Sequence, residues 1–238
     1  MKIERVGQYY IDTEVKDRLS IGIETENLQS CIKEAKSKNA IAVFGCPSFG
    51  FKQADIDFLS ELPQIESVWF WDVELENIDG IYNLKYLKKF GIHPKRPGID
   101  FSHFKKLKEI IWEYNKNDSG ISSLEKVELF HAWHFNPKSK SYQDLQIPAH
   151  VQELQINWAN PESLNGMPIL PELTCFEIHR CRNLKTIDDL PSIAPALKKL
   201  VITTSKNVTD ASNIVTRLPN LRFANINGSI LVDNGILQ

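Results

Sequence analysis

Residues 173–181 read Leu173-Thr-Cys-Phe176-Glu-Ile178-His-Arg-Cys181, and this short pattern decides the fold. Two residues separate the first apolar position from the second, and one residue separates the second from the third. Residues 107–115, Leu107-Lys-Glu-Ile110-Ile-Trp112-Glu-Tyr-Asn115, repeat the pattern with Asn at the end. Residues two apart in a strand face the same side, so each copy predicts one short strand whose apolar residues point inward.

The pattern recurs through most of the chain. Its copies start at residues 65, 87, 107, 124, 151, 173, 197 and 221, so successive copies are 22, 20, 17, 27, 22, 24 and 24 residues apart. The fourth copy is read as Ile121/Leu124/Val127/Leu129. A Leu-Pro pair precedes several copies, at Leu62, Leu170, Leu190 and Leu218, and proline suits the turn before a strand. Recurrence near 22 residues predicts a stack of similar units that share one core.

Over about residues 62–228 the chain resembles the leucine-rich repeat family, whose consensus is LxxLxLxx[N/C]xL. The resemblance implies an α/β leucine-rich-repeat solenoid with a curved parallel β-sheet on its concave face. Short helices, turns or loops would cover the convex face. A degenerate ninth copy begins near Lys38, with apolar residues at Ile41, Val43 and Cys46. The consensus Asn/Cys position holds other residues in several copies, so we expect a broken polar ladder there: Val73, Lys95, Ala132, Ala159 and Ser205.

A stack of repeats needs a cap at each end, and the sequence provides a candidate for each. Residues 1–37 are expected to form the N-terminal cap, with a short helix over Asn27–Lys38 that turns Leu28, Cys31, Ile32 and Ala35 to one side. The repeats then occupy residues 38–228 as eight to nine units. Residues 229–238 form the C-terminal cap, in which Ile230–Gly235 reads as a final strand and turn.

Composition excludes several classes of protein. Of the 238 residues, 28 are Lys or Arg and 30 are Asp or Glu, which argues against a general nucleic-acid binder. No run approaches the roughly 20 apolar residues that span a bilayer, and the N-terminus lacks a secretory signal. Four scattered cysteines form neither a disulfide framework nor a CxxC metal site. We therefore expect a cytoplasmic protein with free thiols and no membrane partner.

Alternate strand residues should project from the concave face, and many of them are aromatic or charged. Aromatic residues on a solvent-facing sheet are typical of a protein-binding surface. The alternative is that Trp69 or Trp71 only fills a gap beneath a cap. The projecting residues are Trp69, Trp71, Asp72, His93, Glu109, Glu113, Tyr114, Glu128, Phe130, His131, Glu153, Trp158, Glu177, His179 and Arg180.

The charged residues at these positions are mainly acidic. Six acids, including Glu128 and Glu153, face four bases: Lys89, Lys126, Arg180 and Lys199. This excess favours a partner with a basic surface. An ordinary solvated polar face explains the charges equally well.

The interval of 27 residues before Val151 predicts a long loop over residues 131–142. Its aromatic side chains, Trp133, His134, Phe135 and Tyr142, are candidate partner contacts, because insertions in a solenoid leave the stack intact. Packing of the same side chains against the flank of the solenoid is the equal alternative.

Catalytic motifs are missing from the sequence. His131 and His134 form an HxxH pair, but the metalloprotease glutamate is absent and the nearest third ligand, His150, lies beyond the loop. Cys175 and His179 would lie about 13 Å apart on one strand, at ~3.3 Å per residue, too far for proton transfer. No phosphate-binding glycine loop or GxSxG elbow occurs. The sequence predicts neither an enzyme nor a bound metal or cofactor.

Together these features predict a protein–protein interaction module that binds through its concave face. Within that class we favour a bacterial inhibitor or immunity protein that neutralises a toxin domain with a basic surface. A scaffold or adaptor in a cytoplasmic complex is the second hypothesis. A metal-binding or enzymatic protein that uses His131 and His134 is a weaker third one.

Overall fold

The computed structural model describes residues 2–14 and 18–238, and the chain divides into two compact units. Unit 1 comprises Met1–Ile110 and Asn115–Ser119, and unit 2 comprises Ile111–Tyr114 and Gly120–Gln238. Part of the expected N-terminal cap, residues 1 and 15–17, lies outside the described residues.

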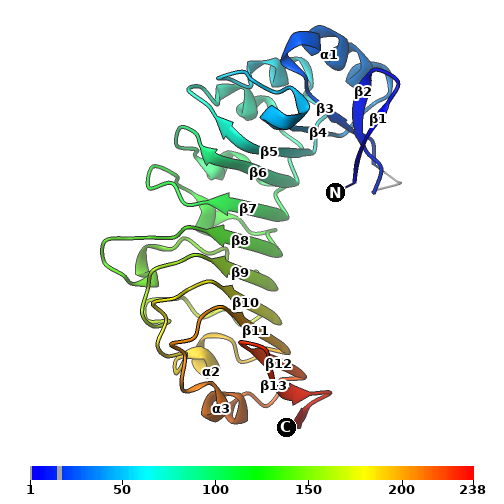
Figure 1. Ribbon diagram of the computed structural model, residues 1–238. Coiled ribbons are helices and arrows are strands. Elements are labelled where there is room, and N and C mark those ends of the chain that lie inside the picture. Colours follow the sequence, from blue (N-terminus) through cyan, green and yellow to red (C-terminus); the bar gives the residue numbers. More distant parts are fainter. Residues whose placement is uncertain (1, 15–17) are drawn as a thin grey trace. The chain divides into compact units, whose positions relative to one another are not determined.

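In unit 1 the strands follow one another in sequence order across the sheet (Figure 1). The strands β1, β2 and β3 pair antiparallel, and β3 to β6 pair parallel. Strand β4 confirms a strand in the degenerate copy near Lys38, and it carries Val43, which is buried. The strands are β1 Ile3–Val6, β2 Tyr9–Asp12, β3 Ser20–Gly22, β4 Ala42–Gly45, β5 Ser67–Glu74 and β6 Lys89–Lys95.

Unit 2 continues the same arrangement within its own strands. Strands β8 to β12 pair parallel, and β12, β13 and β14 pair antiparallel at the C-terminal end. The final strand and turn expected at residues 230–235 are confirmed by β13. The strands are β8 Leu129–Trp133, β9 Glu153–Asn157, β10 Cys175–His179, β11 Lys199–Thr203, β12 Phe223–Ile226, β13 Ser229–Asp233 and β14 Ile236–Leu237, while β7 Glu109–Glu113 is divided between the units.

Helices are short and connect the strands, so the chain is an α/β protein with a mostly parallel sheet, as expected. Helix α1, Leu28–Ser37, confirms the helix expected after Asn27 and buries Cys31, Ile32 and Ala35. Pro191 opens helix α2, and is therefore not in a turn before a strand. The others are α2 Leu190–Ile193, α3 Ala211–Ile214 and the 3-10 helices Thr25–Asn27, Pro47–Phe49, Asp57–Glu61, Asp79–Asn83, Phe101–His103, Ile121–Ser123, Tyr142–Asp144 and Val215–Arg217.

The longest helix in the described part of the chain, α1, has ten residues, and no described helix is long and apolar enough to cross a membrane.

One side of each parallel strand supplies the core. In β10 the side chains of Phe176 and Ile178 are fully buried, and their neighbours Cys175, Glu177 and His179 are half-buried. The same alternation holds in β8, where Phe130 and Ala132 are buried. A strand with one apolar and one mixed side therefore leaves one face of the sheet available at the surface.

The fourth copy of the repeat lies three residues later than the sequence pattern suggested. Phe130 pairs with Leu154 of the next strand and stacks on Trp112, with ring centroids 5.8 Å apart. The copy therefore starts at Val127, not Leu124. The intervals of 17 and 27 residues become 20 (107 to 127) and 24 (127 to 151), so the repeat is more regular than expected and contains no long insertion.

The polar ladder at the Asn/Cys position continues at Ser205, one of the residues where we expected a break. The Cys181 N–H donates to Ser205 Oγ at 3.1 Å, and the Ser205 N–H donates to Asn227 Oδ1 at 3.0 Å. A serine hydroxyl is both donor and acceptor, so Ser205 replaces the consensus side chain. Burial raises the pKa of the Cys181 thiol to about 11, which keeps this side chain protonated.

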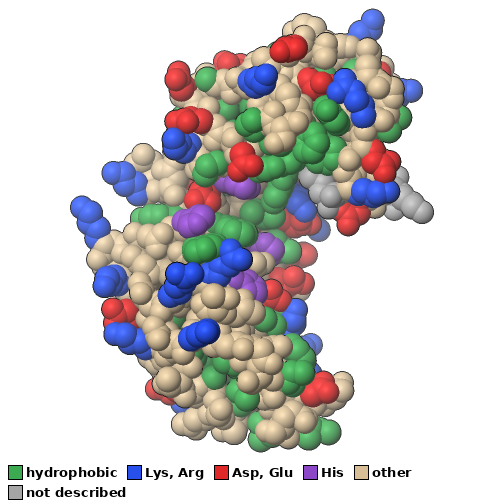
Figure 2. Space-filling view, in the orientation of Figure 1, with side chains coloured by type: hydrophobic (Ala, Val, Ile, Leu, Met, Phe, Trp, Pro, Cys, Tyr) green, Lys and Arg blue, Asp and Glu red, His purple; other side chains and the backbone are tan. Residues whose placement is uncertain are grey.

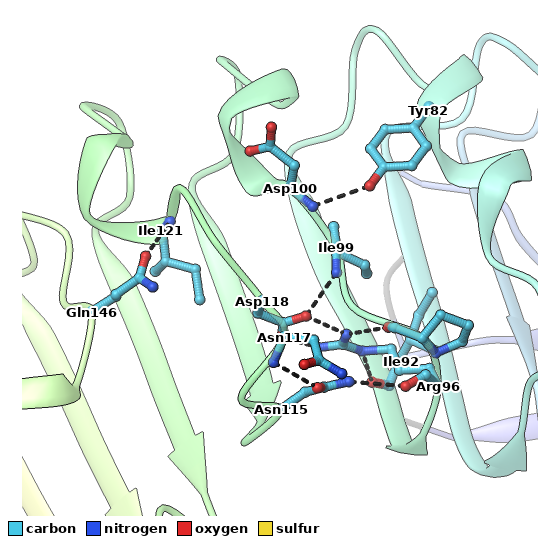
Figure 3. A network of polar contacts seen from close by, with 11 residues as sticks. Tyr82, Ile92, Arg96, Ile99, Asp100, Asn115, Asn117, Asp118, Ile121 and Gln146 are labelled. Carbon is cyan, nitrogen blue, oxygen red and sulfur yellow. Dashed lines mark hydrogen bonds and ion pairs between the residues drawn. The ribbon is translucent and has the colours of Figure 1, made fainter.

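In unit 1 a buried ion pair fixes the segment that follows β6 (Figure 3). Arg96 Nη1 and Nη2 donate to the two carboxylate oxygens of Asp118 at 2.7 and 2.6 Å, and both side chains are at most 1% exposed. Asp118 also accepts the Ile99 N–H at 2.8 Å, and Arg96 Nε donates to the Ile92 carbonyl at 3.2 Å. The charges are thus fully paired, as burial requires.

Candidate functional site

The outer face of unit 2 is the set of side chains that alternate with the core residues in β8 to β12; most are half-buried, Glu153 and Lys199 are exposed, and Asn157 is buried. Parallel pairing in register aligns them in three rows. Figure 2 shows histidine, hydrophobic and charged side chains mixed on one face of the molecule. The first row is Leu129, Glu153, Cys175, Lys199 and Phe223; the second is His131, Gln155, Glu177, Val201 and Asn225; the third is Trp133, Asn157, His179 and Thr203.

Glu177 is the centre of a polar network on this face. Lys199 Nζ donates to Glu177 Oε1 at 2.6 Å, and His179 Nε2 lies 3.1 Å from Oε2. His179 Nδ1 lies 2.7 Å from Thr203 Oγ1, so the imidazole bridges a carboxylate and a hydroxyl. The Cys175 thiol lies 3.9 Å from Glu177 Oε1. Cys175 and His179 therefore meet the same carboxylate and form no nucleophile–base pair.

The network changes the ionisation of its members. Partial burial of Glu177 opposes ionisation, but hydrogen bonds from Lys199 and His179 outweigh this effect, and the pKa of the carboxyl lies below its usual value. The hydrogen bond to Glu177 raises the pKa of Lys199. Burial raises the pKa of the Cys175 thiol. At neutral pH the network thus contains one carboxylate, one ammonium and a neutral thiol.

We expect Glu177→Gln to reduce stability at pH 7 and to have a smaller effect as the pH falls. The folded pKa of Glu177 lies below the unfolded value, so ionised Glu177 stabilises the fold above the unfolded pKa and loses this contribution as pH falls through the folded pKa. Urea denaturation of both proteins between pH 7 and pH 3 measures the difference. Glu128→Gln is the control, because Glu128 is exposed; its effect should not vary in this way. A constant Glu177→Gln effect across this range would contradict the network.

A hollow of about 410 Å³ opens on the outer face of unit 2 beside this network. Its walls come from four neighbouring strands, β8 to β11, and combine apolar, acidic and basic groups. The volume lies within the roughly 300–1,000 Å³ of ligand pockets. The lining residues are Leu129, His131, Glu153, Leu154, Gln155, Cys175, Glu177 and Lys199.

The residues that directly follow β8, β9 and β10 form a stacked row, which we call the edge strip: His134, Trp158 and Arg180. The His134 ring stacks on Trp158 with centroids 6.1 Å apart and planes 27° apart. The Arg180 guanidinium lies 4.7 Å from the centre of the Trp158 ring. His134 Nδ1 lies 2.8 Å from Glu113 Oε1, which anchors the strip at one end.

The three residues of the edge strip have a backbone conformation that is unfavourable for bulky side chains. His134, Trp158 and Arg180 have φ values of 53°, 56° and 58°, in the left-handed region. Glycine and asparagine adopt this conformation most readily, and a bulky residue there is unusual. By register the equivalent residues are Thr204 after β11, with φ 52°, and Gly228 after β12, with φ 96°, and of these two the glycine has the preferred residue type. Strained residues of this kind are concentrated at functional sites, so the edge strip is a candidate contact surface.

Unit 1 has an aromatic cluster on the corresponding side of its own strands. Trp69 and Trp71 lie 6.5 Å apart between ring centroids, and His93 meets the Trp69 ring edge-on at 5.9 Å. Gly91 makes room for Trp69, because a Cβ at that position would lie 2.5 Å from the indole ring. Trp71 also stacks on Phe44 at 6.2 Å, so it partly fills a gap beneath the N-terminal strands while remaining half-exposed.

Several predicted residues lie at the surface with defined contacts. Asp72 is exposed in β5, and Glu109 of β7 pairs with Lys89 at 2.7 Å. Tyr114 follows β7 and meets the Phe135 ring at 5.0 Å. Glu128 is exposed but precedes β8, so it lies outside the three rows.

The predicted projection of Phe130 and Phe135 is wrong. Both side chains are fully buried, because the three-residue shift in register places Phe130 on the inner side of β8 and Phe135 at the Asn/Cys position. Tyr142 is also fully buried and stacks on Phe135 at 5.8 Å. Of the two alternatives for residues 131–142, packing into the structure is therefore correct for these rings, while His134 remains exposed.

Gln155 lines the hollow and was not predicted as a site residue. Lys199 was predicted only as one of the bases of this face, and Cys175 was considered only as a nucleophile, although both also line the hollow. The signal was available, because each occupies the first or second outward position of a strand in the repeat.

The HxxH pair is divided between two environments. His131 lines the hollow, whereas His134 belongs to the edge strip. Within residues 2–14 and 18–238, no three His, Cys, Asp or Glu side chains are grouped as metal ligands would be.

The arrangement can bind by stacking, charge and hydrogen bonds across one continuous surface of unit 2. The chain matches no protein-family model, and no curated protein matches its sequence.

Proposed function

We propose that this protein binds another protein through the outer face of unit 2, and that it is an inhibitor or immunity protein that neutralises a toxin domain. The observation that carries the proposal is the edge strip, in which His, Trp and Arg occupy three successive left-handed positions. Fold stability alone favours Asn or Gly there. Tryptophan and arginine are also the residues most enriched at the energetic centres of interfaces.

A leucine-rich-repeat architecture is part of the same proposal. The corrected intervals of 22, 20, 20, 24, 22, 24 and 24 residues support it, as does the hydrogen-bonded ladder at Cys181 and Ser205. In such a fold each repeat contributes one strand to a shared binding surface, so the edge strip would span three repeats.

The partner we propose presents a basic surface to the acidic residues of this face, within the cytoplasm of a bacterial cell. Glu153 and Glu177 lie on adjacent rows, and Glu113 anchors the edge strip. Complementary charge accelerates association and selects among partners. An inhibitor of this kind masks the basic active-site region of a toxin and itself catalyses no reaction.

Affinity capture from source cells tests the proposal when two baits are compared. The first bait is the native chain, and the second carries Trp158→Asn and Arg180→Asn in the edge strip. We expect one stoichiometric partner with the native bait, bound at about nanomolar affinity, and its loss with the variant. Equal capture by both baits would show that the edge strip is not the binding surface. A diffuse set of weak partners would favour the scaffold or adaptor function instead.

A further inference from the structure

We propose that the hollow on the outer face of unit 2 receives one basic side chain, lysine or arginine, of the partner protein, with Glu153 as its counter-ion. The inference rests on the proposed function, since it names the chemistry of the group that the partner inserts. It also stands on the hollow itself, which small molecules can probe directly.

Glu153 provides the charge that the hollow leaves unmatched. Glu177 already shares its two oxygens with Lys199 and His179. No hydrogen bond or ion pair engages the Glu153 carboxylate within the described part of the chain, and its charge acts only at longer range, on Lys199 and on Cys175, its neighbour in the first row. The hollow therefore contains two carboxylates and one ammonium group, which leaves a formal charge of −1, with His131 counted as neutral, for a cation to neutralise.

The other walls suit the rest of a basic side chain. Leu129 and Leu154 offer apolar contact to the methylene stem, as lysine and arginine stems prefer. Gln155 Nε2 donates to Asn157 Oδ1 at 3.0 Å, which turns the amide nitrogen away and leaves the Gln155 carbonyl oxygen as an acceptor. Cys175 adds no negative charge, because burial holds its thiol in the protonated form at neutral pH.

Lys199 limits the affinity of the hollow for a cation. Its ammonium group reaches Glu177 from the neighbouring strand, so it reduces the attraction that an incoming cation meets. A side chain delivered by a protein partner overcomes this limitation, because the rest of the interface holds it in place. This is why we infer a partner's side chain as the occupant and not a free cation.

The test is an NMR titration of the whole chain with N-acetyl-arginine methylamide and N-acetyl-lysine methylamide. The neutral citrulline analogue, which has almost the same shape as arginine, is the probe control. We expect saturable shifts of the Gln155 side-chain amide and of β9 and β10 with the two cationic probes, and none with citrulline. Glu153→Gln should weaken binding about tenfold. Lys199→Met should strengthen it, and Glu128→Gln, outside the hollow, should leave it unchanged.

Equal binding of the citrulline analogue, or an unchanged affinity in Glu153→Gln, overturns the proposal, as does the absence of saturable shifts at the solubility limit of the probes. The outcome is separable from that of the proposed function. Probe binding without a captured protein would retain the hollow as a cation site and reject the protein-binding function. A captured partner whose affinity is unchanged in Glu153→Gln would retain the protein-binding function and reject the hollow as the site of its basic side chain.

Discussion

Asp118→Asn is expected to lower the free energy of unfolding by about 3–5 kcal/mol, the largest effect of any single exposed or buried charge considered for this protein. The substitution retains an oxygen that accepts the Ile99 N–H but leaves the Arg96 guanidinium buried without a counter-ion. Phe90 and Phe101 face that guanidinium at 5.5 and 6.0 Å, and the Ile92 and Pro97 carbonyl oxygens accept from it, but none of these groups carries a negative charge. Urea denaturation followed by tryptophan fluorescence measures the loss.

Two further variants separate burial from charge. Lys95 pairs with Glu74 at 3.0 Å, but their side chains are 68% and 72% exposed, so Lys95→Ala should cost less than about 1 kcal/mol. The double variant Arg96→Met/Asp118→Leu removes both charges together and should recover most of the stability, because apolar residues fit beside the two phenylalanines. If Asp118→Asn costs no more than Lys95→Ala, the ion pair does not hold this segment in solution.

The spacing of the repeat determines which side-chain contacts can be predicted from the sequence. Arg96 and Asp118 are 22 residues apart, and Lys199 and Glu177 are also 22 apart. His134 and Glu113 are 21 apart. Side chains one repeat apart lie close together in a stacked fold, so the interval brings each pair within reach. It does not fix the contact, because Lys199 lies in register with Cys175 and reaches Glu177 diagonally. The same regular interval made it possible to predict the strands and most of their inward-facing residues from the sequence pattern.

The fourth copy shows where pattern reasoning fails. Leu124, Val127, Leu129 and Phe130 are all apolar, so two registers three residues apart fit the sequence equally well. The difference decides whether Phe130 lies in the core or at the surface. Only the pairing of Phe130 with Leu154 and its stacking on Trp112 resolve the choice. The sequence alone does not show which register buries its apolar residues, because that depends on contacts with the neighbouring strands.

The hollow and the edge strip were beyond the sequence for a different reason. Each depends on where long side chains end, and not on which strand position they occupy. Lys199 donates a hydrogen bond to Glu177 and not to Glu153, while Arg180 turns to Trp158. Several partners lie within reach of each of these side chains, and the sequence does not rank them.

Trp158→Asn is expected to weaken partner binding about 30-fold, which corresponds to about 2 kcal/mol, with little change in stability. The loss follows because the indole links His134 and Arg180, so its removal disorders both neighbours. Calorimetry with the captured partner measures the affinity. Tyr86→Ala is the control, because Tyr86 is an exposed aromatic residue (50%) in unit 1, outside the strands, and its removal should leave the affinity unchanged.

Asparagine is chosen at position 158 so that the effect on partner affinity can be separated from the effect on the free energy of unfolding. Asparagine tolerates the φ of 56° at this position, so relief of about 1 kcal/mol of backbone strain offsets part of the lost ring packing. We therefore expect the free energy of unfolding to change by less than about 1 kcal/mol. If stability and affinity fall together, Trp158 is there to pack the sheet edge. If affinity alone falls, the strained tryptophan is retained for the partner, because nothing in the fold requires it.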